Sequence, residues 1–272
     1  AEHFGAIEGA SIEANKGAYS SAWMIIFGVI AAIMMLIGIY HIKMLPSTQV
    51  PSTTKKTASE VGYELVAVIA NFFTKKHILY YICFIILYRL AEGFIMKIAP
   101  LFLRASRDVG GLGLSLTEIG TLNGIFGSAA FVLGSLLAGI YVSKFGLKKT
   151  LFTLCCIFNL PFVAYTFLAV TQPTNVYLIG TCITMEYFGY GFGFVGLTLF
   201  MMQQIAPGKH QMSHYAFASG IMNLGVMLPG MVSGYFSDLL GYRNFFIYVL
   251  IAAIPAFLIT YFIPFTYDDS KK

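Results

Sequence analysis

Seven apolar runs in this chain of 272 residues are each long enough to cross the hydrocarbon core of a membrane as a helix. Crossing ~30 Å of hydrocarbon takes about 20 helical residues. Charged residues make up 11% of the sequence, whereas a soluble domain carries about 25%. Both features predict an all-α, multi-pass integral membrane protein surrounded by lipid. The predicted spans are 20–44, 77–103, 116–142, 150–170, 176–205, 213–239 and 244–264.

Cysteine usage and net charge argue against several other classes of protein. The four cysteines lie inside apolar runs, without the spacing of a disulfide framework or a metal site, so we expect neither metal nor cofactor. The formal net charge of +5 does not indicate nucleic-acid binding, because the basic residues flank the predicted spans, where they orient the chain. The cysteines are Cys83, Cys155, Cys156 and Cys182.

The distribution of lysine and arginine sets the expected orientation. If the acidic N-terminal tail lies outside, eleven basic residues fall on the cytoplasmic side and four on the outer side. The excess persists, at seven against four, when the long segment 45–76 is left out. Two further basic residues, Arg89 and Lys97, fall within a span. We therefore expect the first span to run from the outside to the cytoplasm.

Segment 45–76 is the longest connection, and its character changes along its length. The part from Pro46 to Lys56 is rich in Pro, Ser, Thr and Lys. The later part carries apolar residues at helical spacing, which indicates a short helix lying on the membrane surface. The first turns of the next span are the alternative. The apolar residues are Val61, Leu65, Val68, Ile69 and Phe72.

A ten-residue pattern occurs twice, each time where an apolar run ends. The copies stand 95 residues apart (Gly139 to Gly234), and segments that begin at Glu92 and Glu186 stand 94 apart. Repeats of this length predict two equivalent triplets of helices, as in many secondary transporters, although chance matches among 27 glycines are the alternative. The copies read Gly139-x-x-x-Ser143-x-x-Gly146-x-Lys148 and Gly234-x-x-x-Asp238-x-x-Gly241-x-Arg243.

Span 77–103 contains three charged residues. Insertion scales assign about 2.5–3.5 kcal/mol to each such residue at a helix centre, so these side chains must face partners or water. Arg89 and Glu92 are i,i+3 neighbours and can form an ion pair. Lys97 points away from Glu92, toward another helix or the membrane surface. An ion pair that only stabilises the bundle is the alternative to a role in function.

Glu186 lies near the middle of the fifth span, with no basic neighbour in its own helix. An apolar setting disfavours the ionised carboxylate. A carboxyl that binds and releases a proton is what a proton-coupled carrier needs, so Glu186 is a candidate for proton coupling. A neutral carboxyl that only packs between helices is the alternative. Glu118 differs, because Ser115-Leu116-Thr117-Glu118 matches a capping box and predicts a structural role.

Aromatic and amide side chains near the two carboxyls are candidates for contact with a solute. Aromatic rings can stack on sugar rings in a cavity, although the same rings can face lipid. Glycines at four-residue spacing in three spans predict close approach of helices. The candidate cavity residues are Tyr88, Tyr187, Tyr190, Asn123 and Asn223.

The repeated pattern resembles the loop motif of the major facilitator superfamily. The first copy departs from that motif, because Ser143 stands where the acid is expected, which puts a charge-relay gate at this loop in doubt. Three other segments are similar to the seventh, tenth and eleventh helices of AmpG-type muropeptide permeases. They are Tyr88-Arg89-Leu90-Ala91-Glu92-Gly93-Phe94 with Pro100-Leu101-Phe102-Leu103, then Glu186-Tyr187-Phe188-Gly189-Tyr190-Gly191, and the stretch from Ala218 to Phe236.

The resemblance covers residues 19–266 and implies the C-terminal six-helix half of a twelve-helix transporter, built as a 3+3 inverted repeat. It implies that the chain, which begins at Ala1 without an initiator Met, is part of a longer protein whose N-terminal half is a partner. The implied divisions are an outside tail (1–18), the sixth helix of the transporter (19–44), a cytoplasmic linker with an amphipathic helix (45–76), the six-helix half (77–266) and a cytoplasmic tail (267–272).

For function, the resemblance implies proton-driven import of anhydromuropeptides across the inner membrane. Glu92 and Glu186 would then bind protons or substrate, Arg89 would pair with a carboxylate, and Lys97 is a further coupling candidate. The eight residues of the repeated pattern would belong to gating loops. A major facilitator transporter of another solute, such as acetyl-CoA, is an alternative.

A seven-helix receptor and an enzyme are the alternatives to a transporter. A complete seven-helix receptor or photoreceptor would also have its N-terminus outside. However, span 244–264 has no lysine for a retinal Schiff base, and the third span lacks the acid-Arg-Tyr switch of such receptors. An enzyme is disfavoured, because no His-Glu-x-x-His motif, nucleophile elbow or paired set of metal ligands occurs.

Overall fold

In the computed structural model, the described residues (5, 13–44 and 57–267) are mainly helical and contain no strand. They fall into two compact units, Ala1–Thr57 and Ala58–Lys272. Most of the expected N-terminal tail, residues 45–56 of the expected linker and residues 268–272 of the expected C-terminal tail lie outside the described residues.

The first unit contains one helix, α1 (Lys16–Met44), which matches the first predicted span. Its 29 residues exceed the about 20 needed to cross hydrocarbon. None of its residues is buried, and apolar side chains occur on all its sides. A helix that is apolar all round is suited to a membrane.

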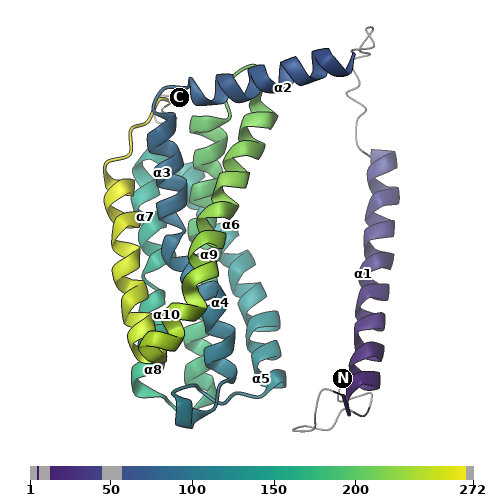
Figure 1. The fold of residues 1–272 in the computed structure, drawn as a ribbon, viewed down its shortest axis with the longest axis vertical. Coiled ribbons are helices and arrows are strands. Elements are labelled where there is room, and N and C mark those ends of the chain that lie inside the picture. Colours follow the sequence, from purple (N-terminus) through teal and green to yellow (C-terminus); the bar gives the residue numbers. More distant parts are fainter. Residues whose placement is uncertain (1–4, 6–12, 45–56, 268–272) are drawn as a thin grey trace. The chain divides into compact units, whose positions relative to one another are not determined.

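The second unit is a bundle of helices that run back and forth between two ends (Figure 1). Five helical stretches in the described chain, α1 included, are long and apolar enough to span a membrane, which confirms the predicted all-α membrane class. The elements of the bundle are α2 (Ala58–Phe73), α3 (Ile78–Tyr88), α4 (Leu90–Arg104), η2 (Arg107–Val109), α5 (Leu116–Thr121), η3 (Leu122–Gly127), α6 (Ser128–Phe145), α7 (Leu147–Asn159), α8 (Phe162–Thr171), α9 (Val176–Phe200), η4 (Met201–Ile205) and α10 (Gln211–Tyr261).

Local breaks make the observed elements differ from the predicted spans. Predicted span 77–103 is split at Arg89, whose φ of −103° and ψ of 5° separate α3 from α4. The elements η3 and η4 are π-helical turns that interrupt or extend their spans. Conversely, α10 joins the last two predicted spans across a kink at Gly241. Broken helices and π-helical turns are frequent at functional sites.

Glycines set how closely the helices of the bundle approach one another. A Cβ added at Gly93 of α4 would overlap the Pro229 side chain of α10, and one at Gly191 of α9 would overlap the carbonyl oxygen of Phe131 in α6. These crossings have no room for any other residue. Close packing, as predicted from spacing, also holds for Gly189 and Gly193, whereas Gly120, Gly124 and Gly234 meet nothing within 4 Å.

Polar contacts tie the loops together at each end of the bundle. At one end, the Lys75 ammonium donates to the Pro207 carbonyl at 2.7 Å and also to the Ile205 carbonyl, and burial lowers the pKa of Lys75. At the other end, the Arg107 guanidinium donates to the Gln172 carbonyl at 2.9 Å. We refer to these as the Lys75 end and the Arg107 end.

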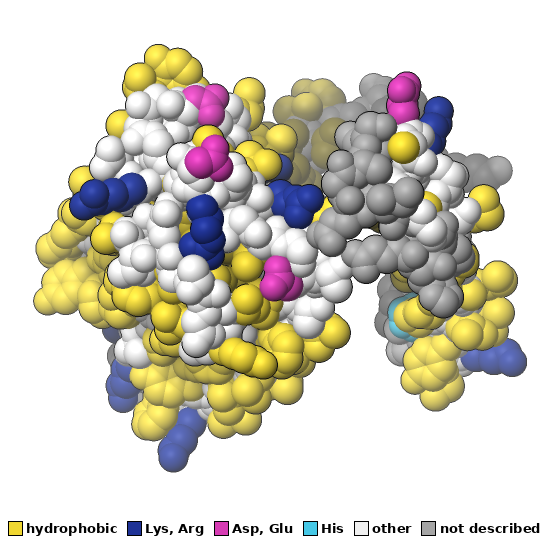
Figure 2. Space-filling view, turned by 90° about the horizontal axis from the view of Figure 1, so that it is seen from below, with side chains coloured by type: hydrophobic (Ala, Val, Ile, Leu, Met, Phe, Trp, Pro, Cys, Tyr) yellow, Lys and Arg dark blue, Asp and Glu magenta, His cyan; other side chains and the backbone are white. Residues whose placement is uncertain are grey.

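Basic residues are distributed unevenly between the two ends. At the Arg107 end, acidic and basic side chains lie beside one another, as Figure 2 shows in the view onto that end. Lysines gather at the Lys75 end, which is the end predicted to be cytoplasmic. The lysines are Lys75, Lys76, Lys144, Lys148, Lys149 and Lys209, and the charged residues of the other end are Arg104, Arg107, Arg243, Asp108, Glu118 and Asp238.

The amphipathic helix α2 lies across the Lys75 end of the bundle (Figure 1). Its Phe72 is buried and contacts the rings of His214 and Phe217 in α10. Leu65, two turns earlier on the same side of the helix, is exposed, and so is Phe73 on the adjacent side. Exposed apolar side chains at the end of the spans can enter the boundary of the bilayer, and the placement of this helix on the membrane surface stays a prediction.

The two copies of the repeated pattern occupy corresponding positions at opposite ends of the bundle. Gly146 joins α6 to α7 with φ 79° and ψ 149°, and Gly241 forms the kink in α10 with φ 70° and ψ 160°. Residues with a side chain rarely adopt this backbone conformation. Both turns therefore require glycine for the same reason. The inverted relation of the two helix triplets stays a prediction.

Candidate functional site

A buried ion pair lies at the break between α3 and α4. Arg89 Nε donates to Glu92 Oε2 at 2.6 Å, and Nη2 donates to Oε1, so the pair is bidentate. Arg89 is 4% exposed and Glu92 is 5% exposed. Because Glu92 lies in the first turn of α4, the positive end of the helix dipole also favours its carboxylate. The predicted pairing is present, across a helix break rather than within one continuous helix.

Aromatic residues of α9 surround this ion pair. The Phe194 ring lies against the guanidinium, with 5.5 Å between Arg89 Cζ and the ring centroid, which is a cation–π contact. The Tyr190 side chain lies close to both Arg89 and Glu92. Tyr190 also interacts electrostatically with Glu186, one turn earlier in α9. It therefore connects the ion pair with the second carboxyl.

Glu186 lines a cavity of about 130 Å³ between α4, η3, α8 and α9. Asn123 reaches this cavity from the π-helical turn, and its buried Oδ1 has no hydrogen-bond partner among the described residues. Within residues 57–267, Glu186 forms no ion pair, and it lies close enough to Glu92 for the two carboxylates to repel each other. The other lining residues are Ile95, Met96, Ala99, Pro100, Leu103, Tyr165, Tyr187 and Tyr190.

Three predicted site residues lie away from this cavity. Tyr88 is fully buried, and its hydroxyl donates to the Gly193 carbonyl at 2.9 Å, so its ring packs α3 against α9. Lys97 is exposed on α4, with its stem beside Gly230 of α10. Asn223 is exposed and bonds within its own helix. The structure thus brings together Glu92, Arg89, Glu186, Tyr187, Tyr190 and Asn123.

Two residues of the site were missed by the sequence reasoning, namely Phe194 beside Arg89 and Tyr165 in the cavity wall. With 25 phenylalanines and 17 tyrosines in the chain, aromatic identity alone singles out no position. Only the crossing of α8 and α9 with α4 reveals them.

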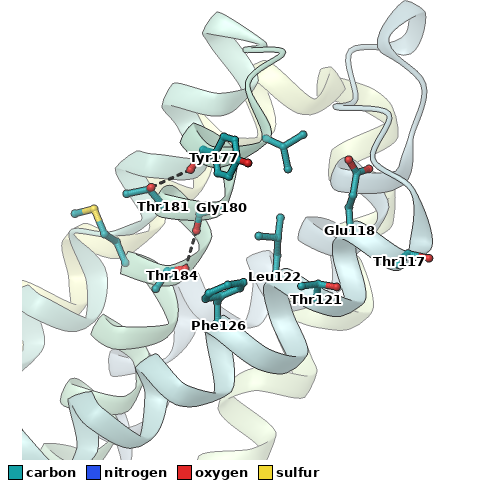
Figure 3. A pocket seen from close by; sticks show the side chains of 11 residues that line it. Thr117, Glu118, Thr121, Leu122, Phe126, Tyr177, Gly180, Thr181 and Thr184 are labelled. Atoms are coloured by element: carbon teal, nitrogen blue, oxygen red, sulfur yellow. Dashed lines mark hydrogen bonds between the residues drawn. The ribbon is translucent and has the colours of Figure 1, made fainter.

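A larger groove of about 530 Å³ between α5, η3 and α9 has fewer polar groups available to bind a ligand (Figure 3). The Thr181 and Thr184 hydroxyls donate to carbonyls of their own helix, at 2.9 and 2.7 Å. Glu118 accepts from the Ser115 backbone and caps α5, which confirms the predicted capping box. Most polar groups of this groove therefore already have partners, and its remaining lining is mainly apolar.

The residues of the repeated pattern lie at the two ends of the bundle, away from the Glu186 cavity. Ser143 and Gly146 border another cavity at the Lys75 end, together with Gly139. Asp238 is exposed at the Arg107 end, near the hydroxyl of Tyr242. This placement agrees with loops at opposite membrane faces, and their role as gates stays a prediction.

The chemistry available at the site is proton binding combined with charge recognition. A carboxyl without a cationic partner, such as Glu186, can hold a proton in an apolar bundle. Arg89 can bind an anionic group if Glu92 becomes neutral, because its guanidinium is always charged. Described residues 57–267 contain no cluster of His, Cys, Asp and Glu suited to a metal ion.

We expect the Glu92→Gln substitution to lower thermal stability substantially. It leaves the Arg89 guanidinium buried without a counter-charge, and breaking a buried ion pair costs about 3–5 kcal/mol. The double variant Arg89→Leu/Glu92→Leu removes both charges and should recover most of the loss. Melting of the purified protein in detergent measures both effects. Wild-type melting of Glu92→Gln would contradict a buried, charged pair.

An all-α bundle in which Glu186 lines a cavity between membrane-spanning helices, beside the buried Arg89–Glu92 ion pair, has the features of a multi-pass membrane transporter. Among known proteins, the anhydromuropeptide permease of Escherichia coli (strain K12) is 23% identical to this chain over 209 residues, covering 77% of the chain and 41% of the permease. A protein named transporter AmpG 1 from Rickettsia bellii is 24% identical over 228 residues, covering 84% of the chain and 53% of that protein.

These relatives confirm the resemblance to AmpG-type permeases. The chain spans about two fifths to one half of their length. A transporter AmpG 2 of Rickettsia prowazekii, 24% identical over 206 residues, covers 73% of the chain and 47% of that protein. No protein-family profile matches the chain. The names of the relatives favour a transporter over a seven-helix receptor.

Proposed function

We propose that this chain is part of a proton-coupled transporter that imports anhydromuropeptides, or a related solute of amino sugar and peptide, across the inner (plasma) membrane by alternating access. The observation that carries the proposal is Glu186, a carboxyl without an ion-pair partner in the described bundle, linked through Tyr190 to the buried Arg89–Glu92 pair. Relatives named as anhydromuropeptide permeases support the solute class.

The site chemistry suits such a solute. Anhydromuropeptides carry sugar rings and peptide carboxylates. Tyr187 and Tyr190 offer aromatic faces at the cavity, and the unpartnered Asn123 Oδ1 can accept a hydrogen bond from a hydroxyl or amide. Proton binding at Glu92 would release Arg89 to pair with a carboxylate of the solute. Proton and solute would then bind at connected positions, which coupling requires.

The Glu186 cavity is small for a solute-binding site, which supports additional helices that would complete its wall. At about 130 Å³, the Glu186 cavity is smaller than the about 300–1,000 Å³ typical of ligand pockets. The exposed cation Lys97 and the open glycines Gly120 and Gly124 lie on faces that lipid alone would not satisfy. We propose that further helices, corresponding to the rest of the relatives' length, complete the cavity wall and face these residues.

Transport by the intact protein tests this function directly. In right-side-out membrane vesicles, we expect uptake of radiolabelled anhydromuropeptide when the outside is more acidic than the inside, and loss of that uptake on adding a protonophore. Vesicles without the protein are the control. Uptake insensitive to the protonophore would contradict proton coupling. Uptake of acetyl-CoA in place of the muropeptide would contradict the proposed solute.

A further inference from the structure

A second polar cavity lies at the Lys75 end of the bundle, apart from the Glu186 cavity. Its volume is about 580 Å³, and it lies between the end of α6, the start of α7 and the junction of α9 with η4. Its polar lining comes from Ser143, Lys144, Lys149 and Gln203, and none of the described acidic residues lines it. The apolar part of the lining is Val142, Phe145, Val195 and Leu199.

Comparison of the two copies of the repeated pattern shows that the turn between α6 and α7 lacks a carboxylate. In the second copy of the pattern, Asp238 places a carboxylate three residues before Gly241. In the first copy, Ser143 holds the equivalent position, so the pattern supplies no carboxylate there. Gly146, at the N-cap of α7, provides no side-chain cap for the N–H groups of the first turn. These N–H groups and the positive end of the helix dipole therefore add to the positive potential that the lysines create in the cavity. An anion from outside the chain would replace the missing carboxylate.

We infer that this cavity binds the phosphate group of an anionic phospholipid. The ammonium groups of Lys144 and Lys149 provide the charge, and Ser143 and Gln203 provide further hydrogen-bond donors. The apolar lining, from Val142 to Leu199, can contact the acyl chains. Basic pockets between spans on the cytoplasmic side are suited to anionic head groups, and the Lys75 end carries the excess of lysine. This inference does not depend on the proposed function.

Native mass spectrometry of the intact protein tests the inference, with phosphatidylglycerol added in phosphatidylcholine-containing detergent micelles. We expect the wild type to retain phosphatidylglycerol in preference to phosphatidylcholine. Ser143→Asp, which restores the carboxylate of the other copy, and the double variant Lys144→Gln/Lys149→Gln should each bind phosphatidylglycerol on the order of tenfold more weakly. Lys209→Gln changes the charge of the same end by one unit, as Ser143→Asp does, but Lys209 does not line the cavity, so this variant should bind as the wild type does.

Each outcome bears on the cavity itself. Wild-type retention of phosphatidylglycerol in both Ser143→Asp and the double lysine variant would overturn the inference, provided that their melting shows folded protein. An equal loss in Lys209→Gln would also overturn it, because the attraction would then belong to the whole basic end. Displacement of the lipid by millimolar inorganic phosphate would support the phosphate site and identify free phosphate as a competing source.

Discussion

Replacing Glu186 with Gln should stop net uptake driven by a proton gradient while leaving the protein folded in the membrane. Glutamine keeps the size and most of the hydrogen-bonding capacity of the side chain, but it cannot release a proton. Because Glu186 forms no ion pair within the described bundle, the substitution leaves no buried cation without a partner. We therefore expect a functional loss without the loss of stability predicted for Glu92→Gln.

Two transport modes separate proton coupling from solute binding in this variant. Net uptake requires Glu186 to release its proton on the cytoplasmic side, so we expect it to fall to the background of vesicles without the protein. Exchange of labelled for unlabelled solute needs no such release and should persist. Glu118→Gln is the matched control, because Glu118 caps α5 outside the cavity and a capping box accepts Gln. Wild-type net uptake in Glu186→Gln would remove this residue from the mechanism.

Replacing Gly191 with Ala should destabilise the bundle strongly, although only one methyl group is added. The new Cβ would overlap the Phe131 carbonyl oxygen and lie 2.8 Å from the carbonyl carbon. These atoms belong to the backbone of α6 and cannot move alone, so α6 and α9 must separate. Ser135 Oγ, which donates to the Gly191 carbonyl at 3.1 Å, would lose this bond between the helices. Overpacking costs typically about 1–3 kcal/mol even where side chains can adjust.

The same substitution at Gly220 is the matched control. A Cβ there meets nothing within 4 Å in the described structure, and alanine is a better helix former than glycine by about 0.5–1 kcal/mol. We expect Gly220→Ala to match or exceed the wild type in the fraction of protein that stays monodisperse after heating in detergent, and Gly191→Ala to show a large decrease. Equal heat resistance in Gly191→Ala and the wild type would contradict the close α6–α9 crossing.

Local features of the fold could be predicted from sequence because their partners lie within one helical turn. The Arg89–Glu92 pair and the Ser115–Glu118 capping box both depend on three-residue spacing, and both are present. The apolar runs likewise predicted the five helical stretches that are long and apolar enough to span a membrane, since the length of a run sets whether it can cross. The break at Arg89 was not predicted, because a helix interruption at a charged residue depends on the helices packed against it.

Contacts between helices could not be read from spacing. Tyr88 and Tyr190 both lie near carboxyls along the chain, yet Tyr88 is buried against Gly193 while Tyr190 reaches the site. Similarly, Gly189 and Gly120 both have a glycine four residues later, but only the former packs against another helix. In each case the rotation of one helix relative to its neighbours decides the outcome, and side-chain packing over the whole bundle sets that rotation.

The sequence by itself determined that this protein is a helical membrane protein and that the lysines of its bundle, apart from Lys97, lie at one end, because hydrophobic length and charge placement act along the chain. It also determined the pairing of neighbouring charges. Only the tertiary structure decided that Glu186, Asn123 and Tyr190 meet at one cavity while Lys97 stays outside it. The reason is physical: residues more than about one turn apart come together only where helices cross, and those crossings depend on packing that no single segment contains.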